Sequence, residues 1–517
     1  MLFTLLACRD DAPPEPVAAS VLEARPEAPA GPVLAVGGDV NLGRRTNALV
    51  AENGADWALG GVPQLATAEL AYVNLECVVA TAGDYRVDKG ESGPYYYRAR
   101  PEMLAVLQAA GIDVVGTANN HVGDYGPPAV REQATLLDAA GLAHAGSGPH
   151  RESACGPTFA RAGDLIAAFY AVDATMSPYA ATADRAGACY LDPAQPEAWT
   201  RFAREAANTT SGRAHLAFLG VHWGDNGVFE PSATTRALAR AAIQGGFDGI
   251  LGSSAHFVHG VEIVDGRPVI YDAGNLLFDA RGESEGALFE LTLSAGGVRE
   301  VRITALDPDY GHTRVARGED GVTLAQLYAD RSLALGTSLW VGGNEIVVPL
   351  PKPPAREPPA RPEPVDRTGT PARAAAGPAA TCVSDQVPPD AQVADVAVGP
   401  LTLVGRRVGP SRLSRRGMID VETWWRVSQP LEKNVLIAVR ATLDEGSASW
   451  SGEHDGCDWS WPTERWEPGT LYHDRYALRP APKPRPGTYT VSVGVADTPL
   501  GAQREPVEIG AFTLGID

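Results

Sequence analysis

A proline- and alanine-rich segment over residues 351–391 divides this 517-residue chain into two regions with different sequence patterns. The segment begins with the run Pro-Lys-Pro-Pro-Ala-Arg-Glu-Pro-Pro, and such a composition cannot bury an apolar core. It is typical of an extended linker. Because the chain is also too long for one ordinary core, the sequence predicts two separately folded regions, residues 32–350 and residues 392–517.

The region of residues 32–350 alternates between short apolar runs and amphipathic helical stretches. Strands are predicted at residues 33–37, 71–74, 113–117, 165–171, 216–221 and 249–252, and helices at residues 101–110, 128–140 and 234–245. Between residues 261 and 304, short strands follow one another without helices. The pattern predicts an α/β domain with a mixed sheet, flanking helices and an antiparallel edge.

The region of residues 392–517 shows the alternation of apolar and polar residues that is typical of strands, with proline and glycine clusters between the runs. This pattern predicts a β-sandwich. Its tryptophans are Trp424, Trp425, Trp450, Trp459, Trp461 and Trp466. We interpret them as filling the sandwich core, and the alternative is a stacking platform for a sugar or a polymer.

The N-terminus predicts a lipid anchor. The segment Leu5–Cys8 resembles a bacterial lipobox, in which the cysteine becomes the lipidated first residue of the mature protein. Residues 1–31 are therefore interpreted as a truncated lipoprotein signal and a tether, and a chance apolar N-terminus is the alternative. We expect a protein of the cell envelope, lipid-anchored to a membrane surface through Cys8 and facing the periplasm or the exterior.

The charge balance argues against one class of partner. Forty-three basic and 63 acidic residues give a formal net charge of −20. We expect no nucleic-acid partner, because affinity for the phosphate backbone comes mostly from Lys and Arg. No apolar run in the sequence is long enough for a transmembrane helix.

The cysteines fit an exported protein weakly. Cys155 could pair with Cys189, and Cys382, near the end of the proline- and alanine-rich segment, could pair with Cys457, which leaves Cys77 odd. The absence of a C-x-x-C motif argues against a zinc knuckle or a thioredoxin-like site.

Groups of polar residues follow directly after apolar strands of the first region. They are Gly38-Asp39, Asn74-Leu75-Glu76, Asn119-Asn120-His121 with Asp124, His222-Trp223-Gly224-Asp225, and the stretch 252–260 followed by Tyr271–Asn275. Since strand ends in an open α/β sheet meet at one crevice, we expect these side chains to lie together. Their types suit Zn, Mn, Fe or Mg, and such a metal would polarise a substrate oxygen or activate a bound water. The alternative is a polar but inert crevice.

In their order and combination these motifs resemble the CapA family of poly-γ-glutamate capsule biosynthesis proteins, which is related to the calcineurin-like metallophosphoesterases. The resemblance covers residues 32–350 and not residues 392–517. It implies a metallophosphoesterase-like fold, with a mixed sheet flanked by helices. It also implies a role in making, exporting or retaining an anionic cell-surface polymer, with capsule-synthesis membrane proteins as partners.

The resemblance also implies residue roles. A divalent metal would be held by Asp39, Glu76, Asn120, His222 and His256. Catalytic roles fall to His121, Asn120 and Asp124, with the Asn-His pair supplying a proton donor to a leaving oxygen. Substrate binding is assigned to Arg44, Asn74, Asn119, Trp223 and Asn275.

One motif departs from the family pattern. Ser254 stands where a histidine is usual, and Ala255 stands where proline is usual. Serine is a poor ligand, so a site for two metals would lose one anchor, although His259 is close enough in sequence to substitute. We expect Ser254 to face the crevice and mark the missing ligand.

Two functions remain open from the sequence. The first is an exported protein of surface-polymer biosynthesis with a metal-assisted hydrolytic (phosphoesterase-like) or transfer activity, and the second is a non-catalytic lipoprotein that binds the polymer. A polyanion would be repelled by a chain of charge −20 unless a cation or a basic patch receives it. Arg44 with Arg45, and Arg98 with Arg100, are the candidate patches, and ordinary solvated arginines are the alternative.

Overall fold

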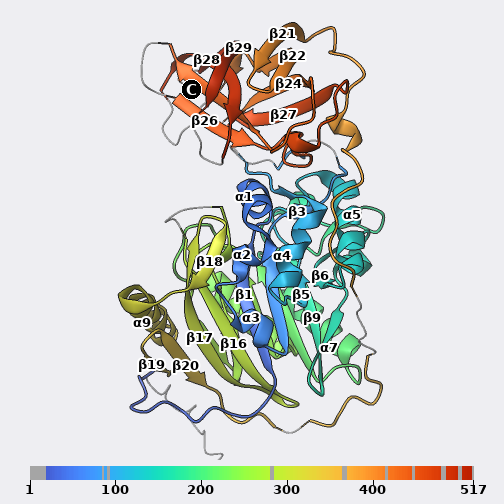
Figure 1. Ribbon diagram of the computed structural model, residues 1–517. Coiled ribbons are helices and arrows are strands. Elements are labelled where there is room, and N and C mark those ends of the chain that lie inside the picture. The colour runs from blue at the N-terminus through green and yellow to red at the C-terminus, as the bar shows by residue number, and fades with distance from the viewer. Residues whose placement is uncertain are drawn as a thin grey trace, which may run out of the picture.

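The computed structural model describes residues 19–83, 87–89, 94–279, 284–354, 356–363, 369–413, 417–444, 449–478, 485–498 and 503–514. Cys8, the predicted lipidation site, lies outside the described residues. A large α/β region carries a smaller region of strands at one end (Figure 1). In the described part of the chain, no helix is both long and apolar enough to cross a membrane.

The larger sheet of the first region has the strand order β19-β20-β17-β16-β1-β2-β5-β6, with β15 paired to β1 and β18 to β17. Its strands are β1 (Val33–Val40), β2 (Leu70–Leu75), β5 (Val114–Gly116), β6 (Ala143–Ala145), β15 (Asn275–Leu277), β16 (Gly286–Ser294), β17 (Gly297–Asp309), β18 (His312–Val315), β19 (Trp340–Gly342) and β20 (Glu345–Pro349). The strands β15, β1, β2, β5 and β6 pair in parallel. From β16 onward the pairing is antiparallel, which is the flank that the sequence predicts.

The smaller sheet of this region has the order β13-β14-β12-β11-β9-β8. Its strands are β8 (Thr158–Ala162), β9 (Leu165–Asp173), β11 (Leu216–His222), β12 (Gly249–Ser253), β13 (Val261–Val264) and β14 (Arg267–Ile270). Short ladders join β3 (Val78–Val79) to β4 (Arg98–Ala99) and β7 (Ser147–Gly148) to β10 (Gly187–Ala188). The strands predicted from the sequence correspond to β1, β2, β5, β9, β11 and β12.

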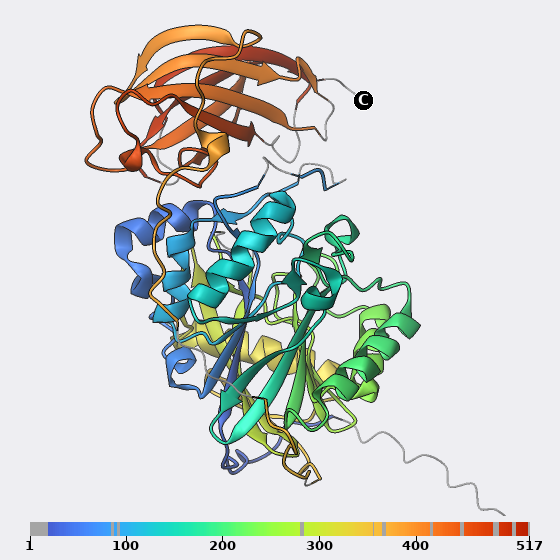
Figure 2. The same ribbon diagram turned by 90° about the vertical axis from the view of Figure 1, so that its right-hand side faces the viewer.

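The two sheets pack face to face and helices cover their outer faces (Figure 2). One apolar core joins both sheets, and within it the rings of Tyr72 and Phe169 stack with centroids 5.8 Å apart. The helices are α1 (Arg45–Asn53), α2 (Ala55–Leu59), α3 (Gln64–Thr67), α4 (Leu104–Ala109), α5 (Gly126–Ala139), α6 (Arg151–Ala154), α7 (Pro196–Thr210), α8 (Ala233–Gly245) and α9 (Gly318–Ala334). This layering is the mixed α/β architecture expected from the alternating pattern.

Helix α8 shows how local sequence sets an element. The Ser232 hydroxyl accepts a hydrogen bond from the backbone N–H of Thr235, which caps the first turn. Leu238, Ala242 and Ile243 recur at helical spacing and are buried against the smaller sheet. Gly246 follows the last turn with φ +129°, a conformation that side chains disfavour.

The C-terminal region contains two sheets, of order β21-β22-β24-β27 and β23-β29-β28-β25-β26. Their strands are β21 (Gln392–Val398), β22 (Leu401–Gly409), β23 (Arg412–Leu413), β24 (Ile419–Val427), β25 (Leu436–Leu443), β26 (Ser449–His454), β27 (Tyr472–Leu478), β28 (Gly487–Ala496) and β29 (Arg504–Leu514). One apolar core contains residues of both sheets, among them Trp425 and Val491. All the tryptophans of the region are buried, which favours packing over a stacking platform.

Both disulfide pairs that the sequence allows are formed, Cys155–Cys189 and Cys382–Cys457. Among the described cysteines, Cys77 keeps a free, buried thiol. The first link stays within the region of residues 32–350, and the second ties the segment 351–391 to the C-terminal region.

The segment between the regions lies along the surface of the first region (Figure 1). The Arg356 guanidinium pairs with Asp248, Glu363 pairs with Arg213 at 2.8 Å, and the Thr370 backbone N–H donates to the carbonyl of Ala139. The sequence predicts an extended linker, and these polar contacts add attachment points that its composition does not reveal.

Candidate metal centre

Asp39 reaches the edge of the larger sheet through a glycine turn at the end of β1. A Cβ atom on Gly38 would lie 1.8 Å from the carbonyl oxygen of Gly274, so only glycine fits this close approach. The pairing register shifts between Val36 and Asp39 and then aligns Asp39 with Asn74 of β2. The backbone therefore presents Asp39 beside the end of the neighbouring strand.

Asp39, Glu76 and His256 form a group whose potential ligand atoms all lie within 4.8 Å of one another. His256 Nδ1 is 3.6 Å from Asp39 Oδ2 and 3.9 Å from Glu76 Oε2. The Asp39 and Glu76 side chains are 0% and 1% exposed, whereas that of His256 is 19% exposed. Solvent thus reaches this group on the side of His256.

The buried carboxylate of Glu76 is incompletely satisfied. Its Oε2 has no hydrogen-bond partner among the described residues. Burial, together with the charge of Asp39, raises the pKa of Glu76 well above its ordinary value, and burial also raises the pKa of Asp39. Such an oxygen is costly to bury without a partner, and a cation would supply one.

His222 and Asn74 complete one side of the group. Asn74 Nδ2 donates to Asp39 Oδ1 at 2.7 Å and lies 3.4 Å from His222 Nδ1. His222 Nε2 is 3.9 Å from Glu76 Oε1. Burial lowers the pKa of His222 well below its ordinary value, so its imidazole is neutral, as a metal ligand must be. Asn119 Nδ2 donates to Leu75 O and to Asn74 Oδ1, which places Asn119 behind Asn74.

His121 and Asp124 form a second buried pair beside the group. His121 Nδ1 lies 2.7 Å from Asp124 Oδ2, while His121 Nε2 lies 3.8 Å from Glu76 Oε1. Burial and the charge of Lys89 lower the pKa of His121 to about 4. A neutral imidazole that donates through Nδ1 to Asp124 presents the lone pair of Nε2 toward Glu76. It can donate a proton there only after accepting one.

Asp124 is fixed by partners outside the predicted set. Lys89 Nζ lies 2.9 Å from Asp124 Oδ1, and the Tyr179 hydroxyl donates to the same oxygen at 3.0 Å. Burial alone would raise the pKa of Asp124, but the charge of Lys89 and the hydrogen bond of His121 hold it below its ordinary value. The ring of Tyr97 stacks on His121 with centroids 3.8 Å apart.

The loop after β12 departs from regular geometry. Ser254 and His256 have φ values of +121° and +64°, and Asp272 holds the loop by accepting hydrogen bonds from Ala255 N–H and Gly274 N–H. The backbone N–H of Ser254 donates to Asp39 Oδ2 at 3.3 Å. Ser254 thus contacts the group through its backbone.

Several predicted residues occupy other places. Trp223 packs between Trp199 and Tyr271 in the core and donates through Nε1 to Tyr271 O, so the structure does not support its assignment to substrate binding. The physical reason is that neighbouring residues point to opposite faces at a strand end. His259 Nε2 contacts the carbonyl of Val228, and His259 is not part of the metal group found among the described residues.

Asn275 and Asn120 are the remaining predicted amides. Asn275 Oδ1 contacts His256 Nδ1 at 2.9 Å and thereby orients that ring. The roles of Asn120 as a metal ligand and a catalytic residue stay predictions. Its buried Oδ1 has no hydrogen-bond partner among the described residues.

The basic patches are only partly as expected. Arg98 and Arg100 are buried rather than exposed, and the Arg98 guanidinium lies 3.6 Å from the centroid of the Tyr125 ring. Arg44, predicted to bind substrate, pairs with Asp279 at 3.1 Å and stays 20% exposed. The sequence does not predict Lys89 and Asp279 as residues of the site, because neither follows a predicted strand nor lies in a periodic pattern.

Comparison with known proteins shows what the first region is similar to. Residues 33–280 match the family of the bacterial capsule synthesis protein PGA_cap. The capsule biosynthesis protein CapA of Bacillus anthracis is 25% identical over 278 residues, which are 53% of this chain and 67% of that protein. The PGA biosynthesis protein CapA of Bacillus subtilis is 26% identical over 280 residues, 52% of this chain and 70% of that protein.

A probable polyglutamine synthesis accessory protein of Mycobacterium tuberculosis is 27% identical over 288 residues, 53% of this chain and 72% of that protein. The family match ends before the C-terminal region. Residues 33–280 are thus similar to bacterial capsule synthesis proteins, the CapA proteins among them.

Proposed function

We propose that this protein acts in the biosynthesis, export or retention of an anionic, poly-γ-glutamate-like surface polymer and uses a divalent metal held by Asp39, Glu76 and His256. The observation that carries the metal proposal is the group of two buried carboxylates and one imidazole within 4.8 Å. The names of the relatives, which concern capsule and PGA biosynthesis, support the polymer class. The proposal includes a metallophosphoesterase-type fold for the first region and a β-sandwich for the second.

The residues present fit a divalent cation. Carboxylate oxygens and imidazole nitrogens suit Mn, Zn, Fe or Mg, and the partnerless Glu76 Oε2 would gain a positive partner. His222 could add a fourth donor, since its Nε2 lies 3.9 Å from Glu76 Oε1. When bound, a divalent cation would polarise a substrate oxygen or lower the pKa of a bound water.

The chain's own residues would hold the reacting groups and move a proton. Asn74 holds Asp39 in place through its amide. Neutral His121 presents Nε2 toward the group and would accept a proton there, while Asp124 stabilises the imidazolium that forms. Lys89 fixes Asp124 and keeps it ionised.

The location of the protein belongs to the same proposal. We propose lipidation at Cys8 and a place on the cell envelope, facing the periplasm or the exterior, where capsule-synthesis membrane proteins would be its partners. With a complete signal sequence supplied, Cys8→Ser should move the protein from the membrane fraction to the soluble fraction. Membrane association that survives this substitution would contradict the anchor.

A non-catalytic, polymer-binding role is the second candidate. The observation that favours it is Ser254, which replaces the histidine usual in the family and contacts Asp39 only through its backbone N–H in the contacts described. A single cation held this way could bridge to a polymer carboxylate without hydrolysing it.

Metal analysis of the purified full chain tests the proposal. We expect about one equivalent of Mn, Zn, Fe or Mg in the wild type and little in Glu76→Gln. The matched control, Glu52→Gln, changes an exposed acid of α1 and should retain the metal. Phosphoesterase and γ-glutamyl hydrolase assays then separate the two candidates. Equal metal content in Glu76→Gln and the wild type would contradict the site.

A further inference from the structure

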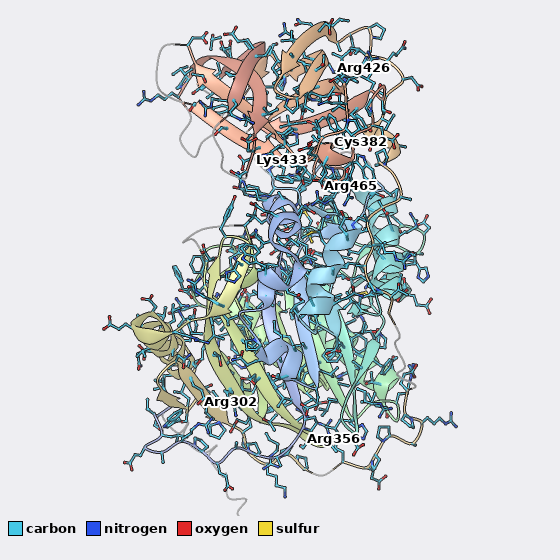
Figure 3. All side chains as sticks on the ribbon, viewed as in Figure 1. Arg302, Arg356, Cys382, Arg426, Lys433 and Arg465 are labelled. Carbon is cyan, nitrogen blue, oxygen red and sulfur yellow. A yellow bond between two sulfur atoms is a disulfide. The ribbon has the colours of Figure 1, made fainter. Side chains whose placement is uncertain are left out.

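The C-terminal region is fixed to the first region next to the metal centre. Arg100 Nη1 pairs with Asp455 Oδ2 at 2.6 Å, and their side chains are 2% and 0% exposed. The Tyr125 hydroxyl donates to Asp458 Oδ2 at 2.7 Å. Arg465, labelled at the junction in Figure 3, pairs with Glu102 at 2.7 Å. A buried charge is costly to leave unpaired, so these contacts hold the two regions in one arrangement.

A cleft of about 240 Å³ lies where the two regions meet. The first region contributes Arg44, Arg45 and Tyr95, and the C-terminal region contributes Ser451, Glu453 and Trp459. Ligand sites are common at such junctions. The volume is below the roughly 300 Å³ at which typical small-molecule pockets begin, so this cleft suits one small unit of a longer ligand.

The most exposed charged groups of this cleft are two arginines. The side chains of Arg44 and Arg45 are 20% and 18% exposed, whereas their carboxylate partners Asp279 and Glu453 are 1% and 9% exposed. Glu453 and Asp458 also line the cleft, but both are buried. A guanidinium carries five N–H donors, more than one carboxylate can accept, so each can bind a further anion. Carboxylates match this planar donor set in bidentate fashion.

The cleft is also linked to the metal centre by direct contacts. The Arg44 guanidinium lies 5.3 Å from the centroid of the Tyr97 ring, which stacks on the His121 ring at 3.8 Å. His121 Nε2 in turn lies 3.8 Å from Glu76 Oε1. One aromatic ring and one imidazole therefore separate the arginines of the cleft from the group Asp39, Glu76 and His256.

We infer that this cleft is a carboxylate subsite, walled on one side by the C-terminal region, which holds one acidic unit of the polymer beside the metal centre. The identity of the polymer rests on the proposed function, whereas the position of the subsite and its two exposed arginines rest on the structure. The C-terminal region, which the family match does not cover, then belongs to the binding site and is more than a spacer.

Blocking the cleft from the C-terminal side tests this inference. Ser451 is an exposed residue of β26 that lines the cleft, and Ser449 is an exposed residue of the same strand outside the lining. Binding of a γ-linked glutamate oligomer to the full chain is measured by calorimetry for the wild type, Ser451→Trp and Ser449→Trp. We expect Ser451→Trp to weaken binding roughly ten-fold or more through a steric clash, and Ser449→Trp to bind as the wild type does.

Arg44→Gln provides a second variant that removes charge without adding bulk, and it should weaken binding as well. Metal content should stay equal in all variants, because none changes a proposed ligand. Equal binding by Ser451→Trp and Ser449→Trp, with a wild type that binds, would overturn the subsite alone. A wild type that does not bind the oligomer would overturn the proposed polymer function and this inference together.

Discussion

Buried acids occur in both regions, and the regions satisfy them differently. In the C-terminal region, Asp455 pairs with Arg100, Asp458 accepts from Tyr125, and Asp474 lies 2.7 Å from His454 Nε2. At the candidate metal centre, by contrast, Glu76 Oε2 has no hydrogen-bond partner among the described residues, and Asp39 lies close enough to repel it. The first set is satisfied within the protein, whereas in the proposed site the second would gain its missing partner from a cation.

The largest effect is expected where an acid of the first kind is removed. Asp455→Ala leaves the buried guanidinium of Arg100 without its carboxylate. We therefore expect the free energy of unfolding to fall by about 3–5 kcal/mol. Urea unfolding of the full chain measures this change, and Asp497→Ala, which removes an exposed acid, is the control variant. A fall in the free energy of unfolding of less than about 1 kcal/mol is typical of a surface ion pair. It would show that the Arg100–Asp455 pair does not hold the two regions together.

The second effect is stabilisation of the metal centre by its cation. A divalent ion at a hundred times its dissociation constant should stabilise the wild type by about 2.7 kcal/mol, because it binds the folded state alone. The same ion should leave the thermal midpoint of Glu76→Gln nearly unchanged. Equal stabilisation of both proteins would place the cation elsewhere.

A smaller effect concerns the dependence of stability on pH without metal. The raised pKa of Glu76 means that the folded protein keeps a proton that the unfolded chain has already released above its ordinary pKa of 4.5. The stability contributed by this group is therefore present below that pH and lost as the pH rises toward the raised pKa.

We expect the wild type to lose stability relative to Glu76→Gln over this range, and added metal should abolish the difference. Chemical denaturation at several pH values, in chelator and then in metal, provides the measurement. Parallel pH profiles in chelator would argue that Glu76 is already satisfied within the protein.

The smallest effect concerns the charge that fixes the second buried pair. Lys89 is, after burial, the largest cause that lowers the pKa of His121, so Lys89→Met should raise that pKa above about 4 in the metal-free protein. Titration of the His121 ring by NMR measures the change, with Arg131→Met on α5 as a surface control. An unchanged pKa of His121 in Lys89→Met would show that Lys89 does not lower it.

Part of the site follows from where polar residues stand in the sequence. Asp39, Asn74 and His121 lie at or just after the ends of parallel strands of the larger sheet, so their meeting is expected. His222 ends β11 of the smaller sheet, and its approach to them depends on how the two sheets pack, which strand position does not give. Strand position does not fix the direction of a side chain, which is why the assignment of Trp223 to substrate binding is unsupported although His222 beside it points to the group. Lys89 lies in a segment without periodicity and gives no signal.

The junction of the two regions was hidden for a different reason. Asp455 and Arg100 are 355 residues apart, and neither lies in a pattern that indicates its partner. The composition of residues 351–391 correctly suggests an extended segment but cannot show that Arg356 would find Asp248. Long-range polar pairing depends on the tertiary fold, which periodicity does not encode.

The most direct test of the central claim is the position of a bound metal ion. Crystals of the full chain soaked in Mn²⁺ should show an anomalous peak about 2.0–2.3 Å from oxygens of Asp39 and Glu76 and a nitrogen of His256. The same peak should be missing from Glu76→Gln. A wild-type structure in Mn²⁺ with no peak at this group, or with the ion bound at other residues, would contradict the account.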